Sequence, residues 1–127
     1  MRLLIDTHVL LWWDQGASTL AKRARELISD EENEVFVSAA SVWEIAVKRR
    51  LKKLEFQGSV AAAISRNGFL PLDISVEDAE EAGGLEWKHP DPFDRLLVAQ
   101  SIRRQLTLMT ADRAIQAFGG SPTFKAR

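Results

Sequence analysis

The sequence predicts an α/β fold in which helices cover both faces of a mainly parallel sheet. Short apolar runs alternate along the chain with longer segments whose apolar residues recur at helical spacing. The few prolines and glycines fall between these segments. Strands that alternate with helices form a parallel sheet, because each helix carries the chain back across one face of that sheet.

The predicted elements begin with a strand over residues 2–5, an apolar run at the start of the chain. Residues 7–13 predict one or two helical turns that end near Gly16. Ser18 belongs to the residue types that favour helix N-caps, and we expect it to begin a helix over residues 19–30.

The second strand is expected over residues 35–37, which are β-branched and aromatic. Either Ser38 or Ser41 caps the next helix, whose apolar face comprises Val42, Ile45, Ala46 and Leu51. Residues 58–67 predict a third amphipathic helix, and Gly68 is suited to end it.

Residues 69–74 predict the next strand, and Ser75 begins a helix that ends at the pair Gly83 and Gly84. A rigid turn is expected at residues 89–92, which read His-Pro-Asp-Pro. The last predicted elements are a helix over residues 93–105, a strand over 106–109 and a helix over 114–118. The predicted sheet therefore has four strands.

The composition is that of a globular protein and excludes several kinds of site. A length of 127 residues fits one compact domain, residues 1–127. The formal net charge is -1, so a nucleic acid would have to bind at a local basic patch. No cysteine is present, which excludes disulfides and thiolate sites. Asp6 and His8 interrupt the apolar N-terminus, so we expect a soluble cytoplasmic protein with no membrane span.

Acidic residues follow the predicted strands at the positions where a parallel sheet forms its binding crevice. Asp6 closes the first strand, and Asp112 lies just beyond the last one. Glu44 lies in the helix after the second strand, while Asp91 and Asp94 stand at the start of a helix. Ligands bind at the carboxyl ends of parallel strands, and we expect this topology to gather these side chains there.

Gathered carboxylates repel one another and therefore recruit protons or cations. With no cysteine and only two histidines in the chain, the ligands on offer are hard oxygen atoms, which favour Mg²⁺ or Mn²⁺ over Zn²⁺. Such ions activate water and neutralise phosphate charge. The constellation thus indicates hydrolysis of a phosphodiester.

Each carboxylate also has a structural interpretation. Asp91 is a natural N-cap with proline after it, Asp94 would complement the helix dipole, and Asp112 can cap the last helix. Glu44 can pair with Lys48 one turn later. Asp6 differs, because a carboxylate at the end of a buried strand is costly without a partner. From the residues alone, a metal site is plausible and these interpretations stay open.

Four segments resemble the motifs of PIN-domain ribonucleases, and in particular the VapC-like toxins of type II toxin–antitoxin systems. The segments are IDTHVLLWW at 5–13, SVWEIAVK at 41–48, HPDPFDRLLVAQ at 89–100 and TAD at 110–112. They occur in the family's order over nearly the whole chain. This chain departs from the family in two places. Residues 50–54 read Arg-Leu-Lys-Lys-Leu where the family usually has a Gly-Lys-Leu turn, and the last helix often carries a tyrosine in the family, whereas Phe118 is the nearest aromatic residue here.

The resemblance implies a three-layer α/β/α sandwich and a single-strand RNA endonuclease that uses Mg²⁺ or Mn²⁺. The family's acids correspond to Asp6, Glu44, Asp94 and Asp112, as metal ligands and catalytic residues. Thr110 and Asp91 would have supporting roles, with Asp91 as a helix cap. The resemblance also implies a homodimer and a cognate antitoxin that blocks the site.

Basic and aromatic residues beside these motifs allow two interpretations each. The densest basic cluster could contact RNA phosphates or form a solvated helix end, and it comprises Lys48, Arg49, Arg50, Lys52 and Lys53. Arg95 could contact the scissile phosphate, although an ion pair with Asp91 is favoured. Trp12, Trp13 and Trp43 could stack on bases, or lie in the core or at an interface with a partner.

Two other functions compete with the nuclease. A haloacid-dehalogenase-type phosphatase needs Asp-x-Asp after the first strand, whereas position 8 is histidine. A phosphoaspartyl receiver needs a paired acid at the first strand and a lysine directly after the last strand, where Asp112 and Arg113 stand instead. The stronger alternative is a non-catalytic PIN-fold binding module whose acidic crevice holds a basic partner peptide.

Overall fold

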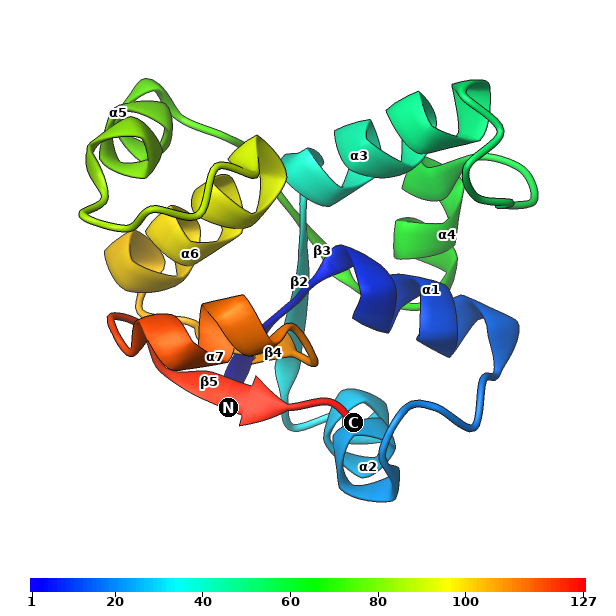
Figure 1. The fold of residues 1–127 in the computed structure, drawn as a ribbon. Coiled ribbons are helices and arrows are strands. Elements are labelled where there is room, and N and C mark those ends of the chain that lie inside the picture. The colour runs from blue at the N-terminus through cyan, green and yellow to red at the C-terminus, as the bar shows by residue number, and fades with distance from the viewer.

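A computed structural model describes residues 1–127 and contains five strands and seven helices (Figure 1). The strands are β1 (Arg2–Ile5), β2 (Glu34–Ser38), β3 (Leu70–Leu72), β4 (Thr107–Thr110) and β5 (Thr123–Lys125). The helices are α1 (Thr7–Gln15), α2 (Lys22–Ser29), α3 (Ala39–Arg50), α4 (Val60–Arg66), α5 (Val76–Gly84), α6 (Pro92–Arg104) and α7 (Arg113–Phe118). None of these helices combines the length and apolar character that crossing a membrane requires.

The strands form one sheet in the order β3-β2-β1-β4-β5, and every neighbouring pair is parallel. In the register of the central strands, Leu4 of β1 lies between Phe36 of β2 and Leu108 of β4. Parallel strands need crossover helices, which the alternating order of elements supplies. The predicted α/β fold with a mainly parallel sheet is confirmed.

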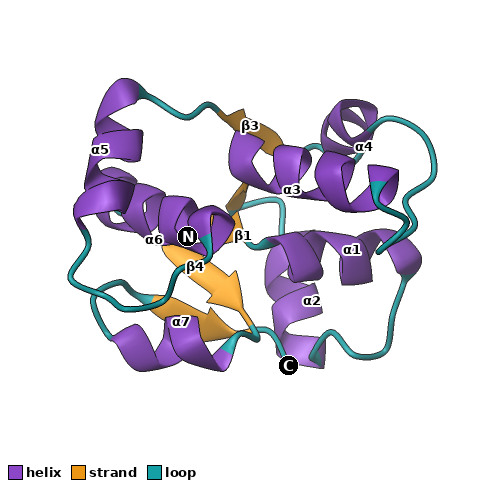
Figure 2. Cartoon of the chain, turned by 45° about the horizontal axis from the view of Figure 1, so that its top comes forward, coloured by secondary structure: helices purple, strands orange, loops and turns teal.

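Alternate residues of the strands enter two separate cores, one on each face of the sheet. Leu3 and Ile5 of β1 pack with α1, α2 and α4, whereas Leu4 packs with α6 and α7. This follows from the period of two along a strand. Figure 2 shows the strands between these two groups of helices. Helix α3 contributes to both cores, through Ala40 and Ile45, and thus spans the carboxyl edge of the sheet.

Most helix boundaries lie close to those expected from capping residues. Ser38 caps α3 by accepting a hydrogen bond from the Ala40 amide, which decides between the two serines. Ser75 begins α5 with a capping box to Asp78. Gly68 has a φ of 71°, which suits the glycine expected to end the third amphipathic helix.

Four local predictions were wrong. Helix α2 begins at Lys22 rather than beside Ser18, which lies in a turn, because the intervening Leu20 is buried in the core instead. Ala46 and Leu51 are exposed, since the apolar face of α3 is narrower than expected. Strand β3 has only three residues. The edge strand β5 was not predicted at all.

A buried polar network connects α5, α6 and the end of β2. Asp78 is fully buried and accepts hydrogen bonds from Gln100, Arg103 and Arg104 at 2.9–3.1 Å. Gln100 accepts in turn from the Ser38 hydroxyl at 2.6 Å. Because Ser38 is both the last residue of β2 and the cap of α3, this network fixes α6 relative to α3.

Candidate active site

The acidic residues expected to gather do lie together at the carboxyl edge of the sheet. They line a cavity of about 90 Å³ that no hydrophobic residue borders. Its walls comprise Asp6, Thr7, His8, Glu44, Lys48, Asp91, Asp94 and Asp112. Five carboxylates from four different parts of the chain therefore share one small space.

Asp6 is positioned by the junction of β1 and α1. Its side chain caps α1 by accepting from the Val9 amide at 2.9 Å, and its own amide donates to the Met109 carbonyl of β4. Only 5% of the residue is exposed. Burial raises the pKa of the Asp6 carboxyl, an effect that hydrogen bonds from Thr110 and Val9 oppose. The nearby Asp112 charge raises this pKa further.

Glu44 lies buried on α3 with both carboxylate oxygens engaged. The Thr7 hydroxyl donates to Oε1 at 2.5 Å and also lies 3.0 Å from the Ser41 hydroxyl. The Lys48 ammonium donates to Oε2 at 2.6 Å, and this hydrogen bond raises the pKa of Lys48. The i,i+4 pair expected from the sequence is thus present, although Glu44 is buried rather than exposed.

Asp94 lies in the first turn of α6 and contacts His89 from the preceding loop. Its Oδ2 is 2.7 Å from Nε2 of His89. Burial is the main cause that raises the pKa of the Asp94 carboxyl to about 6, and the charges of Asp91 and Asp112 add to it. Asp91 itself caps α6, accepting from the amides of Phe93 and Asp94. Asp91 therefore combines the expected cap with a place in the cavity.

Asp112 caps α7 through a 3.0 Å hydrogen bond from the Ile115 amide. Thr110, the last residue of β4, is fully buried and accepts from the Asp112 amide at 2.9 Å. The Thr110 hydroxyl thus orients the turn between β4 and α7, and with it the last acid of the cavity.

The donor atoms of the cavity are chemically suited to a hard cation. They are carboxylate oxygens, and two of the carboxyl groups have raised pKa values that positive charge would lower. In this conformation, however, no three acidic or imidazole side chains converge closely enough to hold one metal ion. Glu44 is paired with Lys48, and Asp94 contacts His89. The donor set fits a divalent cation, and its present arrangement is held by the chain's own basic groups.

The basic cluster at the end of α3 divides into two kinds of side chain. Arg49 donates to the carbonyls of Phe56 and Gly58, so it fixes the loop after α3. The side chains of Arg50, Lys52 and Lys53 form no hydrogen bond or ion pair within the chain and are exposed. These three are free to contact an external anion.

Arg95 does not form the expected ion pair with Asp91. Its guanidinium instead donates to backbone carbonyls between residues 82 and 89. The reason is local, because the end of α5 and the loop after it bring several unpaired carbonyls over this side chain.

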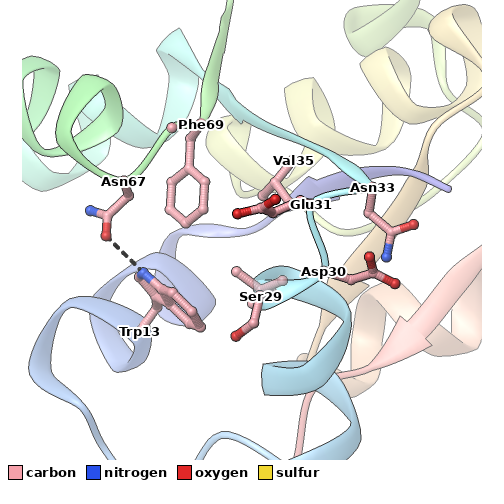
Figure 3. Close-up of a pocket in the computed structure, with 10 residues that line it drawn as sticks. Trp13, Ser29, Asp30, Glu31, Asn33, Val35, Asn67 and Phe69 are labelled. Atoms are coloured by element: carbon pink, nitrogen blue, oxygen red, sulfur yellow. Dashed lines mark hydrogen bonds between the residues drawn. The ribbon is translucent and has the colours of Figure 1, made fainter.

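The tryptophans differ in their surroundings. Trp12 and Trp13, both part of α1, are half-buried and pack against the core. Figure 3 shows Trp13 hydrogen-bonded to Asn67 and facing Phe69, in an open cavity of about 500 Å³ that shares no lining residue with the cavity of the motif acids. Trp43 is 54% exposed and meets Phe93 edge-on at 4.9 Å. Trp43 therefore remains the exposed aromatic nearest to the motif acids in sequence.

Sequence reasoning missed the side chains that hold the acids in place. Thr7 and Ser41 support Glu44, and His89 contacts Asp94. Their neighbours along the chain give little signal, because these contacts depend on how α1, α3 and the loop before α6 are packed. The only available sign was that each lies within three residues, or five for His89, of a motif acid.

Comparisons with known proteins identify relatives of the whole chain. Residues 3–120 match the family model for the PIN domain. Ribonuclease VapC22 of Mycobacterium tuberculosis is 27% identical over 118 residues, which cover 91% of this chain and 90% of that protein.

Solved structures share the fold. A toxin–antitoxin complex from Klebsiella pneumoniae contains a chain with a TM-score of 0.69 and 21% identity, covering 98% of both chains. A chain of VapBC2 from Rickettsia felis, bound to a DNA fragment from its promoter, has a TM-score of 0.68 and 18% identity, again over 98% of both chains.

Proposed function

Because this chain belongs to the PIN domain family, we propose that it is a metal-dependent endoribonuclease that hydrolyses phosphodiester bonds of single-stranded RNA. The observation that carries the proposal is the meeting of Asp6, Glu44, Asp94 and Asp112 in one small polar cavity. Phosphodiester hydrolysis needs concentrated positive charge beside a polyanion, and a cluster of carboxylates is how a protein holds such charge. The similarity to ribonuclease VapC22 supports the same chemistry.

In this proposal the four carboxylates hold Mg²⁺ or Mn²⁺. When bound, the ion neutralises phosphate charge and lowers the pKa of water. The chain's own groups keep the ligands oriented: Thr7 holds Glu44, and the Val9 amide holds Asp6. Thr110 supports the turn that carries Asp112. Lys48 would share the Glu44 carboxylate with the cation, while His89 would keep Asp94 oriented.

The RNA path extends from the cavity along the end of α3. Lys48 lines the cavity, while the unpaired cations Arg50, Lys52 and Lys53 continue beyond it. Phosphate contacts of this kind position a strand without reading its sequence. Arg49 contributes indirectly, by fixing the loop that carries two of these cations.

We further propose that the chain is the toxin of a toxin–antitoxin pair and acts as a homodimer. The toxin–antitoxin complex from Klebsiella pneumoniae, which contains a chain with the same fold, supports an antitoxin partner. An antitoxin that places a basic side chain in the acidic cavity would compete directly with the metal ion. Lys48 already shows that a cation fits beside Glu44 at 2.6 Å.

The test is RNA cleavage by purified protein free of antitoxin, in Mn²⁺ or Mg²⁺ and in EDTA. The matched variant is Asp6→Asn, because asparagine keeps the N-cap of α1 while removing the charge. We expect metal-dependent cleavage by the wild type and a loss of about 100-fold or more in the variant, because removing a ligand should cost at least as much as the ~10–100-fold typical of removing a ligand's supporting partner. Equal activity of the folded variant would contradict the assignment.

One observation favours the alternative of a non-catalytic binding module. The Lys48 ammonium already occupies a cation position in the cavity, as a basic side chain of a partner peptide would. Thermal unfolding separates the two functions, because a ligand of the folded state raises its melting temperature. Stabilisation by millimolar Mn²⁺ supports the nuclease, whereas stabilisation by an arginine-rich peptide alone, without cleavage in any metal, supports the binding module.

A further inference from the structure

The guanidinium of Arg95 is fully occupied by the protein backbone. An arginine side chain has five N–H donors in a fixed plane. Here they meet five carbonyl oxygens at 2.6–3.4 Å, those of Ala82, Gly83, Leu85, Trp87 and His89. No donor is left for a phosphate oxygen, although Arg95 directly follows Asp94 in the chain.

Three of these carbonyls belong to the end of α5 and its cap. The last carbonyls of a helix have no partner within the helix, and a cation there also complements the helix dipole. Arg95 donates to Ala82, Gly83 and Leu85, which lie in this last turn. One side chain of α6 therefore caps α5.

The other two carbonyls belong to the loop that brings His89 to the cavity. Arg95 donates through Nη1 to Trp87 at 2.6 Å and to His89 at 3.1 Å. The two rings of this loop stack, with centroids 4.6 Å apart and planes at 30°. The outer face of the stack is closed by Phe118 of α7, 4.9 Å from Trp87. The backbone and the ring of His89 are thus both held.

The fixed ring of His89 in turn contacts a carboxylate of the cavity. Its Nε2 lies 2.7 Å from Oδ2 of Asp94, and both side chains are largely buried. A partner that orients a metal ligand in this way sets how readily the ligand binds the ion. The chain of contacts runs from Arg95 through the loop to His89 and then to Asp94.

We propose that Arg95 is a positioning residue for the acidic site, which acts through His89 on Asp94 rather than by contacting RNA. The effect of Arg95 on catalysis rests on the proposed nuclease function, whereas its positioning of His89 needs neither metal nor RNA. The charge of Arg95 suits the end of α5, but only its planar array of five donors can hold the helix end and the loop together. Lysine, with one ammonium group, cannot reach carbonyls on both the helix and the loop.

The first experiment compares Mn²⁺ affinity, by isothermal titration calorimetry, between the wild type and Arg95→Lys. We expect affinity to fall about 10-fold or more, the range seen when the support of a metal ligand is lost. The matched control is Arg103→Lys, on the same helix, whose guanidinium binds Asp78 and donates no hydrogen bond to the loop. It should bind Mn²⁺ as the wild type does. His89→Ala, which leaves Arg95 intact, should reproduce the loss and covers the case that Arg95→Lys folds poorly.

The second experiment needs no metal. The chain has two histidines, so its imidazole ¹H–¹³C signals report His89 and His8 separately. Arg95→Lys should shift or broaden the His89 signal and leave that of His8 unchanged. A folded Arg95→Lys protein with the wild-type His89 signal would overturn the proposal. So would weaker RNA binding at unchanged Mn²⁺ affinity, which indicates a phosphate contact. If the wild type binds no Mn²⁺, the metal-dependent function fails, and the imidazole signals still decide the role of Arg95.

Discussion

Two carboxyl groups of the acidic cavity lie in surroundings that disfavour their charge. Asp6 is only 5% exposed and the pKa of its carboxyl is raised, while the pKa of the Asp94 carboxyl is raised to about 6. In both cases the main cause is burial, which removes water from the carboxylate. An ionised group in such surroundings raises the free energy of the folded state. The same charge is what a cation would bind, so stability and function oppose each other at these residues.

Replacing Asp94 should therefore stabilise the metal-free protein at neutral pH. The pKa of about 6 in the folded state lies above the ordinary value of 3.8, so the folded state binds the proton more tightly. The contribution of this carboxyl to stability is greatest below pH ~4, falls as the pH rises to ~6 and is then constant. We expect Asp94→Asn to gain about 3 kcal/mol at pH 7.5, from the rise of the pKa from 3.8 to about 6 at ~1.4 kcal/mol per pKa unit.

The measurement is urea unfolding in EDTA at pH 7.5 and pH 4. The gain from Asp94→Asn should shrink at the lower pH, where the wild-type carboxyl is protonated. Asp91→Asn, which keeps the cap of α6, serves as the control and should change stability little. A variant less stable than the wild type at pH 7.5 would show that the contact with His89 outweighs the cost of burial.

Among the elements, α3 has two ends with different contacts. Its first turn is tied to the sheet through Ser38 and its middle presents Glu44 to the cavity. Its last turn carries three cations: Lys48 pairs with Glu44, Arg49 binds the following loop and Arg50 faces solvent. A single helix thus connects the acidic cavity to the proposed RNA path.

Removing the exposed cations should weaken RNA binding without loss of stability. We expect the triple variant Arg50→Ala, Lys52→Ala and Lys53→Ala to bind single-stranded RNA more weakly. The plot of log affinity against log salt should become less steep, its negative slope shrinking in magnitude by about 2, from ~0.7 for each of three phosphate contacts. Fluorescence anisotropy over a salt series measures this slope, with the metal left out to prevent cleavage.

Arg49→Ala provides the contrast, because its guanidinium serves the Phe56 and Gly58 carbonyls. It should lower the melting temperature and leave the salt slope within experimental error of the wild type's. An unchanged slope in the triple variant would remove the end of α3 from the RNA path.

The elements that could be predicted are those with strong local signals. Ser75 with its capping box and Asp91 with the proline after it mark helix starts that any tertiary structure would keep. Strand β5 has three residues and pairs only with β4, so its existence depends on an edge that sequence cannot reveal. Ser18 is the opposite case: it is a suitable N-cap residue, but it lies in a turn while Leu20 is buried in the core, and the helix begins only at Lys22.

For the molecule as a whole, the network around Asp78 connects α5 and α6 to the carboxyl end of β2, where α3 begins. Asp78 receives two arginines and Gln100, and Gln100 reaches Ser38. These hydrogen bonds and the Ser75 amide hold the pKa of the Asp78 carboxyl well below its usual range, against the opposing effect of burial. The network therefore depends on a charged aspartate.

Asp78→Asn should destabilise the fold by about 3 kcal/mol at pH 7, the order expected when one partner of a buried ionic network loses its charge. A lowered pKa stabilises the folded state above the unfolded value near 4, and this contribution is lost as the pH falls below it. Urea unfolding at pH 7 and pH 3 should thus show that the variant and the wild type differ less in free energy of unfolding at pH 3. An equal difference at both values would assign the loss to packing instead of charge.

The placement of the acids could be predicted because topology brings them together. Asp6 and Asp112 follow β1 and β4, which are neighbours in the sheet, and carboxyl ends of parallel strands share an edge. The contacts of Lys48 and His89 with those acids depend on side-chain rotamers and on the loop held by Arg95. Such details follow from packing between distant segments, which no local pattern encodes.

Three acids of the cavity also cap helices, and this double duty has an evolutionary consequence. Asp6 caps α1, Asp91 caps α6 and Asp112 caps α7. Asparagine, serine and threonine cap almost as well as aspartate, but alanine does not. A descendant that no longer needed its acidic cavity would still need its helix starts. Such a descendant should carry Asn, Ser or Thr in place of Asp at these positions, because selection for folding would remove variants with residues that cannot cap a helix.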